Sequence, residues 1–219
     1  MAKDPLRAFD PARWAAFPST NRYGIPTVRG TSLVPDHLVP YHTRDRVPAT
    51  GTSALHFFTD DHLFEHVWWS PEKTLERVTG AAAVCTPDFS QYHHYPLAGR
   101  IWNVYRKCWL GCYWEAHGLT VIPTVTWAGP ESWDFAFRGV QRGSVVVAGT
   151  IGLEQDSFYW NIWRSGYLEM LRQIDPAVVL IYGENPRVPT RHGVETRRYP
   201  TATETLRATR KARSGEEVV

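Results

Sequence analysis

The stretch SVVVAGTIGLEQDSFYWNIWRSGYLEMLRQIDPAVVLIY, residues 144–182, contains two apolar runs separated by a helical pattern. The runs at 144–151 and 177–182 are continuously apolar rather than alternating, which is typical of strands that are covered on both faces and therefore parallel. Between them, residues 158–174 predict a helix, which Asp175 and Pro176 end. The stretch therefore predicts a parallel β-α-β unit.

The same alternation continues toward the N-terminus. Apolar runs at 54–58, 81–85 and 119–127 alternate with helical patterns at 71–79, 97–117 and 131–138. Because crossovers between parallel strands pack helices on the sheet, the order β-α-β-α-β-α-β-α-β predicts an α/β core with a five-stranded, mainly parallel sheet and flanking helices. Five strands are too few for a complete eight-stranded barrel, so the fold is an open sheet or a partial β/α barrel.

The segments on either side of this core, which we place at 51–185, differ from it in composition. Residues 1–50 contain seven of the sixteen prolines and predict an extended arm that is docked on the core. Residues 186–219 predict a basic, partly disordered tail, in which 201–212 can form one exposed helix. The length of 219 residues suits one domain with extended arms.

Positive charge is concentrated in the tail. The chain has a formal net charge of +2, but residues 186–213 hold eight basic residues against two acidic ones. A basic segment favours polyanions because neutralised phosphates release counterions, so the tail predicts contacts with DNA or RNA; a merely solvated tail is the alternative. The candidate nucleic-acid contacts are Arg187, Arg191, Arg197, Arg198, Arg207, Arg210, Lys211 and Arg213.

The composition argues against membrane and secreted classes of protein. No apolar run approaches the roughly 20 residues that a membrane-spanning helix needs. Residues 1–14 lack the apolar core of a secretory signal, and three cysteines do not make a disulfide framework. We therefore expect a cytoplasmic protein without a membrane partner.

Carboxylates follow three of the five predicted strands. Ligands bind at the carboxyl ends of parallel strands, and these ends carry Asp60, Asp61, Asp88 and Glu184. Converging carboxylates can serve as general acid and base, or can hold a divalent cation. Alternatively, the three aspartates cap the helices that follow. Asp88 is the first catalytic candidate because Pro87 stiffens its loop, and Glu184 is the second.

Three further residues at this edge are candidates for ligand binding. Gly149 and Gly152 permit close approach of a phosphate or sugar, or they only make the turn. Trp127 can stack on a base or a sugar ring, or it packs between helix and sheet.

Asn103 and Arg106 lie on one face of the helix expected at 97–117. Arg106 can bind a carboxylate or phosphate with two hydrogen bonds, or it forms an ion pair with Asp88. The spacing leaves both interpretations open.

Metal and thiol chemistry are not predicted. Cys108 and Cys112 lie one turn apart on an apolar stripe, after the pair His93 and His94. Free cysteine in such a stripe is a small core residue, so we assign no metal site and leave any cofactor unknown. Cys85 lies in a strand without an obvious base partner.

Six motifs resemble a known family: TPDFSQY at 86–92, IWNVYR at 101–106, WLGCYW at 109–114, VIPTVTW at 121–127, SWDFAFRG at 132–139 and GTIG at 149–152. Over about residues 55–185 the chain resembles the domain of unknown function numbered 4417, found on phages, prophages and plasmids. The resemblance implies a mobile-element accessory role and names no activity. The residues that the family pattern stresses are Asp61, Asp88, Ser90, Trp102, Asn103, Arg106, Trp127, Asp134, Gly152 and Tyr182.

Three functions fit these observations. We favour a phage or mobile-element accessory protein that binds or acts on nucleic acid in the host cytoplasm. The alternatives are an α/β enzyme whose carboxylate-lined cleft takes a nucleotide or sugar-like molecule, and a non-catalytic host-takeover factor that binds a cellular protein. The candidate ligand-binding residues are Ser90, Asn103, Arg106, Trp127, Gly149, Gly152 and Tyr182.

Overall fold

The computed structural model describes residues 17–154, 156–183, 188–191 and 193–214. These residues form two sheets, one with the order β1-β2-β3-β4 and one with the order β5-β6-β7, and every pairing is parallel. The strands are β1 His37–Pro40, β2 Ser53–His56, β3 Ala83–Cys85, β4 Val121–Ile122, β5 Val145–Gly149, β6 Val178–Tyr182 and β7 Glu195–Tyr199.

The two sheets are joined just beyond β4. Thr124 forms an isolated parallel bridge with Val147, and Val147 donates its N–H to the Pro123 carbonyl at 2.9 Å. The strands therefore follow one another in chain order across both sheets, as the strands of β/α barrels do.

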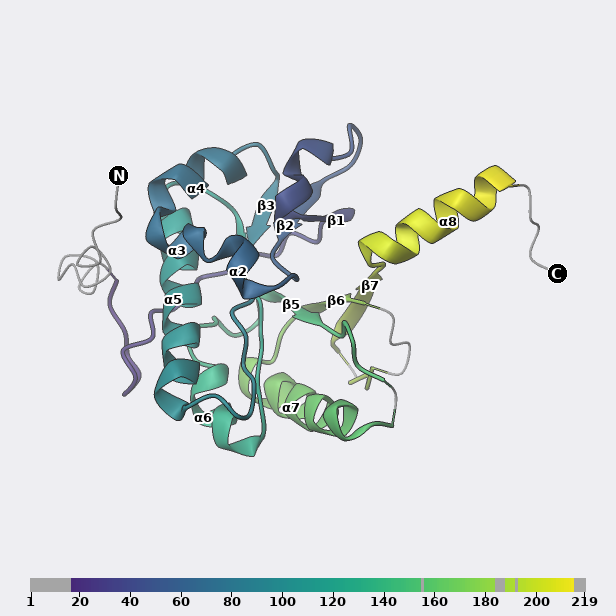
Figure 1. Ribbon diagram of the computed structural model, residues 1–219. Coiled ribbons are helices and arrows are strands. Elements are labelled where there is room, and N and C mark those ends of the chain that lie inside the picture. Colours follow the sequence, from purple (N-terminus) through teal and green to yellow (C-terminus); the bar gives the residue numbers. More distant parts are fainter. Residues whose placement is uncertain (1–16, 155, 184–187, 192, 215–219) are drawn as a thin grey trace.

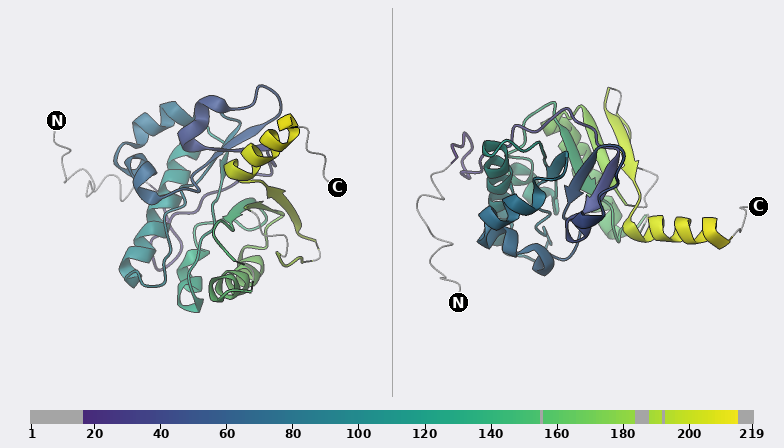
Figure 2. Two further views of the ribbon diagram at one scale, coloured as in Figure 1. Left: turned by 45° about the vertical axis from the view of Figure 1, so that its right-hand side comes forward. Right: turned by 90° about the horizontal axis from the view of Figure 1, so that it is seen from above.

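Helices connect strands β2 to β6 in turn and cover their outer faces (Figure 1). They are α2 Asp61–Phe64, α3 His66–Trp69, α4 Pro71–Val78, α5 Leu97–Ala116, α6 Trp133–Ala136 and α7 Phe158–Ile174, with 3-10 turns η2 Tyr41–Arg46 and η3 Pro130–Ser132. The last helix, α8 Ala202–Ser214, follows β7 and projects away from the body (Figures 1 and 2). Among the described residues, no helix has the length and apolarity that crossing a membrane requires.

Strands β2 to β6 are buried on both faces. On the outer side, Leu55 and Val84 pack against the helices of the first sheet, and Val146 and Ile181 pack against α7. On the inner side, strands from both sheets contribute to one apolar cluster, which includes Ala54, Cys85, Ile122, Val147 and Leu180. This burial explains why the strand sequences are continuously apolar.

The expectation of five strands in one sheet is wrong, because the described residues form seven strands that are divided between two sheets. Each of the five apolar runs overlaps a strand, β2 to β6, and the helix expected at 158–174 is confirmed as α7. The other two strands lie in the expected arm and tail. β1 (HLVP) ends in proline, and β7 (ETRRY) is mostly polar with only its last residue buried, so neither has the pattern of a buried strand.

Candidate functional site

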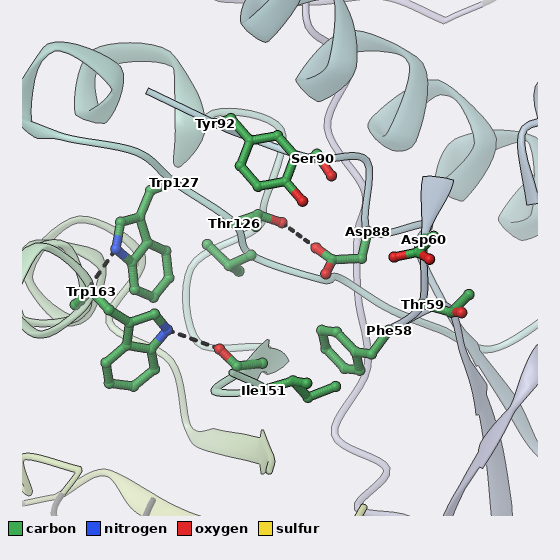
Figure 3. A pocket seen from close by; sticks show the side chains of 12 residues that line it. Phe58, Thr59, Asp60, Asp88, Ser90, Tyr92, Thr126, Trp127, Ile151 and Trp163 are labelled. Atoms are coloured by element: carbon green, nitrogen blue, oxygen red, sulfur yellow. Dashed lines mark hydrogen bonds between the residues drawn. The ribbon is translucent and has the colours of Figure 1, made fainter. Parts of the chain in front are cut away.

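A cleft opens at the carboxyl ends of β3, β4 and β5, where parallel sheets bind ligands (Figure 3). Its inner part has a volume of about 270 Å³, and an overlapping outer part has about 550 Å³. The residues that line both parts are Asp88, Ser90, Tyr92, Thr126, Trp127, Gly149, Ile151 and Trp163.

Asp88 is connected through Thr126 to a buried lysine. The Thr126 hydroxyl donates to Oδ1 of Asp88 at 2.6 Å, and Nζ of Lys107 lies 3.2 Å from the same hydroxyl oxygen. A hydroxyl has one proton to donate, so Thr126 accepts from Lys107 while it donates to Asp88. Lys107 is 1% exposed and comes from α5, whereas Asp88 is half-buried and faces the cleft.

Burial shifts the two ionisable groups in opposite directions. It raises the pKa of Asp88, although the Thr126 hydrogen bond and the charge of Lys107 act against the rise. It lowers the pKa of Lys107, although the charge of Asp88 acts against this fall. A carboxyl group whose pKa is moved toward neutrality in a cleft is suited to proton transfer.

The loop that presents Asp88 is held from behind by polar side chains. The Asp61 carboxylate accepts hydrogen bonds from the Ser90 backbone N–H at 3.1 Å and the Ser90 hydroxyl at 2.9 Å. Asn103 donates to the Ser90 carbonyl at 2.7 Å. Asp61 and Asn103 therefore position the loop, and of the three residues only Ser90 lines the cleft.

Arg106 supports the same loop from inside the protein. Its guanidinium donates to Oδ1 of Asn103 at 3.0 Å, lies 3.5 Å from the centre of the Phe89 ring and forms an ion pair with Glu65. The alternative of an ion pair with Asp88 is therefore wrong. The buried guanidinium is engaged by these partners, which argues against direct contact with a ligand.

Helix capping is not what the strand-end aspartates do. Asp60 precedes α2 without a side-chain capping bond and lies exposed at the margin of the inner cleft. Asp61 binds Ser90 in a loop, and Asp88 binds Thr126. The fourth candidate, Glu184, lies outside the described residues.

Two tryptophans form the wall opposite Asp88 (Figure 3). Nε1 of Trp127 donates to the Trp163 carbonyl at 3.2 Å, Nε1 of Trp163 donates to the Gly149 carbonyl at 2.9 Å, and the ring centres lie 5.5 Å apart. Gly166 lies against the Trp127 ring, which a Cβ at that position would overlap. Trp127 therefore packs between helix and sheet and also lines the cleft along one side. The two interpretations of its sequence position, packing and ligand stacking, are compatible with each other.

A second cavity of about 520 Å³ adjoins the cleft, and Phe58 and Ile151 line both. Arg207 and the first residues of α8 line its other side. Tyr182 belongs to this second cavity: its ring stacks on Phe58 at 5.2 Å, and its hydroxyl oxygen accepts the Ala202 N–H at 3.2 Å. Gly152, with φ of +72°, lines both the outer cleft and the second cavity.

The candidate basic residues fall into three groups. Arg191, Arg197 and Arg198 form ion pairs with Asp175, Asp36 and Glu204, so their charges are partnered within the chain. Arg207 and Arg210 are exposed on α8, and within the described residues no ion pair is recorded for either. Arg187, and the side chains of Lys211 and Arg213, lie outside what the structure describes.

The sequence-based candidates for the site do not include Thr126, Lys107 and Trp163. A signal for Lys107 exists: Arg100, Asn103 and Lys107 are spaced by three and four residues on α5, so polar groups lie along one buried helix face. Thr126 and Trp163 have no comparable signal, because their role depends on contacts between distant segments.

Cysteine and metal chemistry find no support among the described residues. Within them, no group of three or more His, Cys, Asp or Glu side chains is arranged as a metal site. The three cysteines are buried and free, and burial raises the pKa of Cys108 to about 12. A thiolate nucleophile is therefore disfavoured.

These features define a parallel β-α-β protein with a carboxylate-containing cleft at its strand ends. The chain belongs to the family described as Domain of unknown function (DUF4417), whose family model matches residues 17–200. The match confirms the resemblance and extends it to β1 and β7.

Two phage proteins are similar to this chain over most of its length. The Gene 1 protein of Mycobacterium phage L5 is 40% identical over 189 residues, which are 84% of this chain and 82% of that protein. The Gene 1 protein of Mycobacterium phage D29 is 40% identical over 189 residues, 84% of this chain and 69% of that protein. No solved structure matches the chain significantly. The family is therefore phage-associated.

Proposed function

We propose that this protein is a phage accessory protein that binds nucleic acid and acts on one nucleotide unit in the cleft. The observation that carries the proposal is the wall shared by the two cavities. Phe58 and Ile151 line both the cavity that contains Asp88 and the cavity that contains Arg207. A polyanion held by α8 would therefore lie beside the carboxyl group.

Asp88 is the proposed proton-transfer group. Its Oδ1 is fixed by Thr126, which leaves Oδ2 to meet a ligand in the cleft. Lys107 does not line the cleft, so it is a positioning residue that orients the Thr126 hydroxyl from behind. The wall of Trp127 and Trp163 would hold a flat ring opposite the carboxyl group.

The exposed arginines of α8 supply the affinity for phosphate. Arg207 and Arg210 are three residues apart on one helix, so their side chains lie on the same face. Each phosphate neutralised on a single strand contributes about −0.7 to the slope of log K against log salt. Binding is therefore expected to weaken steeply as salt increases.

Fluorescence anisotropy with labelled DNA and RNA, between about 50 and 300 mM salt, tests the binding. Replacing Arg207 and Arg210 by alanine should weaken binding and reduce the salt slope by about 1.4. The matched control is Lys73→Ala with Arg77→Ala, which removes two charges from exposed positions of α4. No binding by the wild type at low salt would overturn the proposal.

The same oligonucleotides, recovered after incubation, test the chemistry by mass spectrometry. A mass change that Asp88→Asn abolishes, while Asp45→Asn at an exposed position retains it, would support Asp88. Equal conversion by wild type and Asp88→Asn would exclude Asp88 as the reacting group.

An enzyme acting on a free nucleotide or sugar-like molecule is a second candidate. The inner cleft of about 270 Å³ favours it, because that volume is at the small end of ligand pockets. This candidate predicts binding of a mononucleotide that is insensitive to the α8 substitutions, with no binding of polymers.

A further inference from the structure

We infer that the mouth of the cleft is a stacking platform for unpaired bases, so that the nucleic acid which enters is single-stranded. The inference rests on the proposed function and adds the form of nucleic acid that the site selects. It comes from a group of rings, here called the aromatic rim, that consists of Tyr92, His93, His94, Tyr95, Phe158 and Tyr159.

The aromatic rim joins two segments that are far apart in sequence. Tyr92 and His94, in the loop between β3 and α5, are stacked with ring centres 5.5 Å apart. His93 reaches across to Tyr159 at the start of α7, with a separation of 6.1 Å, and Tyr159 contacts Phe158 at 5.6 Å. The rings support one another from both sides of the cleft mouth.

Three rings of the rim are more than half exposed. Phe158 is 69% exposed, Tyr159 57% and Tyr92 53%. Removing large aromatic side chains from water is favourable, so they are usually buried. A contiguous exposed apolar patch is typical of a surface that binds a ligand or a partner. The rim is therefore better explained by a ligand than by folding.

Charge and continuity identify the ligand as a nucleic-acid strand. Tyr92, His93, His94 and Tyr159 also line the outer cleft, so the rim leads directly to Asp88 and Trp127. Beyond the inner cleft, the shared wall leads to Arg207 on α8. A surface with aromatic rings at one end and cations at the other complements the bases and phosphates of one strand.

The strand must be unpaired to use this surface. In a duplex each base is stacked on its neighbours and its faces are covered, whereas single-stranded bases stack on exposed side-chain rings. The rings are already in contact with one another, so few side-chain rotamers are lost when a base is added.

The test compares two double variants, Tyr92→Ala with Tyr159→Ala and Tyr92→Phe with Tyr159→Phe. Anisotropy with an oligothymidine of about 15 nucleotides should show a loss of about tenfold per ring in the alanine variant. The phenylalanine variant keeps both rings and should bind as the wild type does. A duplex of the same length should bind more weakly than the single strand. Because both positions are exposed, melting temperatures should be unchanged.

Two results would overturn the inference while the proposed function stands. One is wild-type affinity of the alanine variant when the α8 arginine variant has lost binding. The other is equal affinity for single strand and duplex. If the wild type binds no nucleic acid, the proposed function fails with the inference, and the rim becomes a candidate surface for a protein partner.

Discussion

Asp88 and Lys107 are ionisable residues on either side of the Thr126 hydroxyl, and the fold removes Lys107 wholly and Asp88 partly from water. Placing a carboxyl group in such surroundings costs stability when the group is charged, unless the pairing is complete. The charge of the Asp61 carboxylate raises the pKa of Asp88 further. The charged form of Asp88 therefore lowers the stability of the folded protein, as is common for groups at sites of proton transfer.

The pH dependence of stability tests this shift. The folded protein holds the Asp88 proton more tightly than the unfolded chain does, because the pKa of Asp88 is raised. The stabilisation is complete below the ordinary aspartate pKa of about 3.9 and is lost as pH rises through the folded pKa. Asp88→Asn removes this pH-dependent contribution to the free energy of unfolding. The variant should therefore gain stability relative to the wild type as pH rises from about 4 to 7.

Urea unfolding of both proteins at the two pH values measures the change. Asp45→Asn, at an exposed position, is the matched control and should show no such trend. If Asp88→Asn instead loses stability relative to the wild type as pH rises, the folded pKa is lowered and Asp88 is not suited to hold a proton.

At the residue scale the sequence could indicate Asp88 but not its partners. Asp88, Ser90 and Trp127 lie at or just after the ends of apolar runs, so a single stretch of sequence is enough to place each of them at the ligand edge of the sheet. Lys107 and Thr126 come from different elements, and their contact depends on how α5 packs on β4. The aromatic rim had a local signal in Tyr92-His93-His94-Tyr95, but its other half lies on α7.

At the scale of elements, the boundaries were readable where proline or glycine ends a segment. α7 is preceded by Ser157, whose hydroxyl accepts the Trp160 N–H at 3.1 Å, and it ends before Asp175 and Pro176. β1 and β7 were not readable because an edge strand needs no apolar pattern, and their identity comes from pairing with β2 and β6.

α7 fixes the tryptophan wall of the cleft through one small residue. Gly166→Ala would place a methyl group in the volume of the Trp127 ring, and relieving that overlap should cost about 1–3 kcal/mol of stability. Gly99→Ala on α5 is the matched control, since no atom lies near its added Cβ. It should be neutral or stabilise by up to about 1 kcal/mol.

Thermal unfolding measures both changes. A difference in tryptophan emission between Gly166→Ala and Gly99→Ala, summed over the ten tryptophans, reports altered packing of the tryptophan wall. A fully stable Gly166→Ala protein with an unchanged emission spectrum would mean that α7 can move away without disturbing the cleft.

At the scale of the whole molecule, β7 is held near the start of the first sheet. Tyr199 donates its hydroxyl to the Pro35 carbonyl, and Arg197 lies 3.7 Å from Asp36. Pro35 precedes β1, and Tyr199 comes three residues before α8. These contacts therefore link the last strand to the first and set the point from which the basic helix leaves the body (Figure 2).

Tyr199→Phe is expected to weaken this link without changing the ring that packs in the inner cluster. The buried Pro35 carbonyl would lose its side-chain donor, which should cost about 1–3 kcal/mol of stability. Tyr92→Phe is the matched control, because the Tyr92 ring is exposed and its loss of a hydroxyl should change stability little. Since β7 carries α8, hydrogen exchange should quicken in β1, β7 and the first turn of α8, but not in α5. Uniform protection in Tyr199→Phe would show that strand pairing of β7 with β6 holds α8 in place without the link to Pro35.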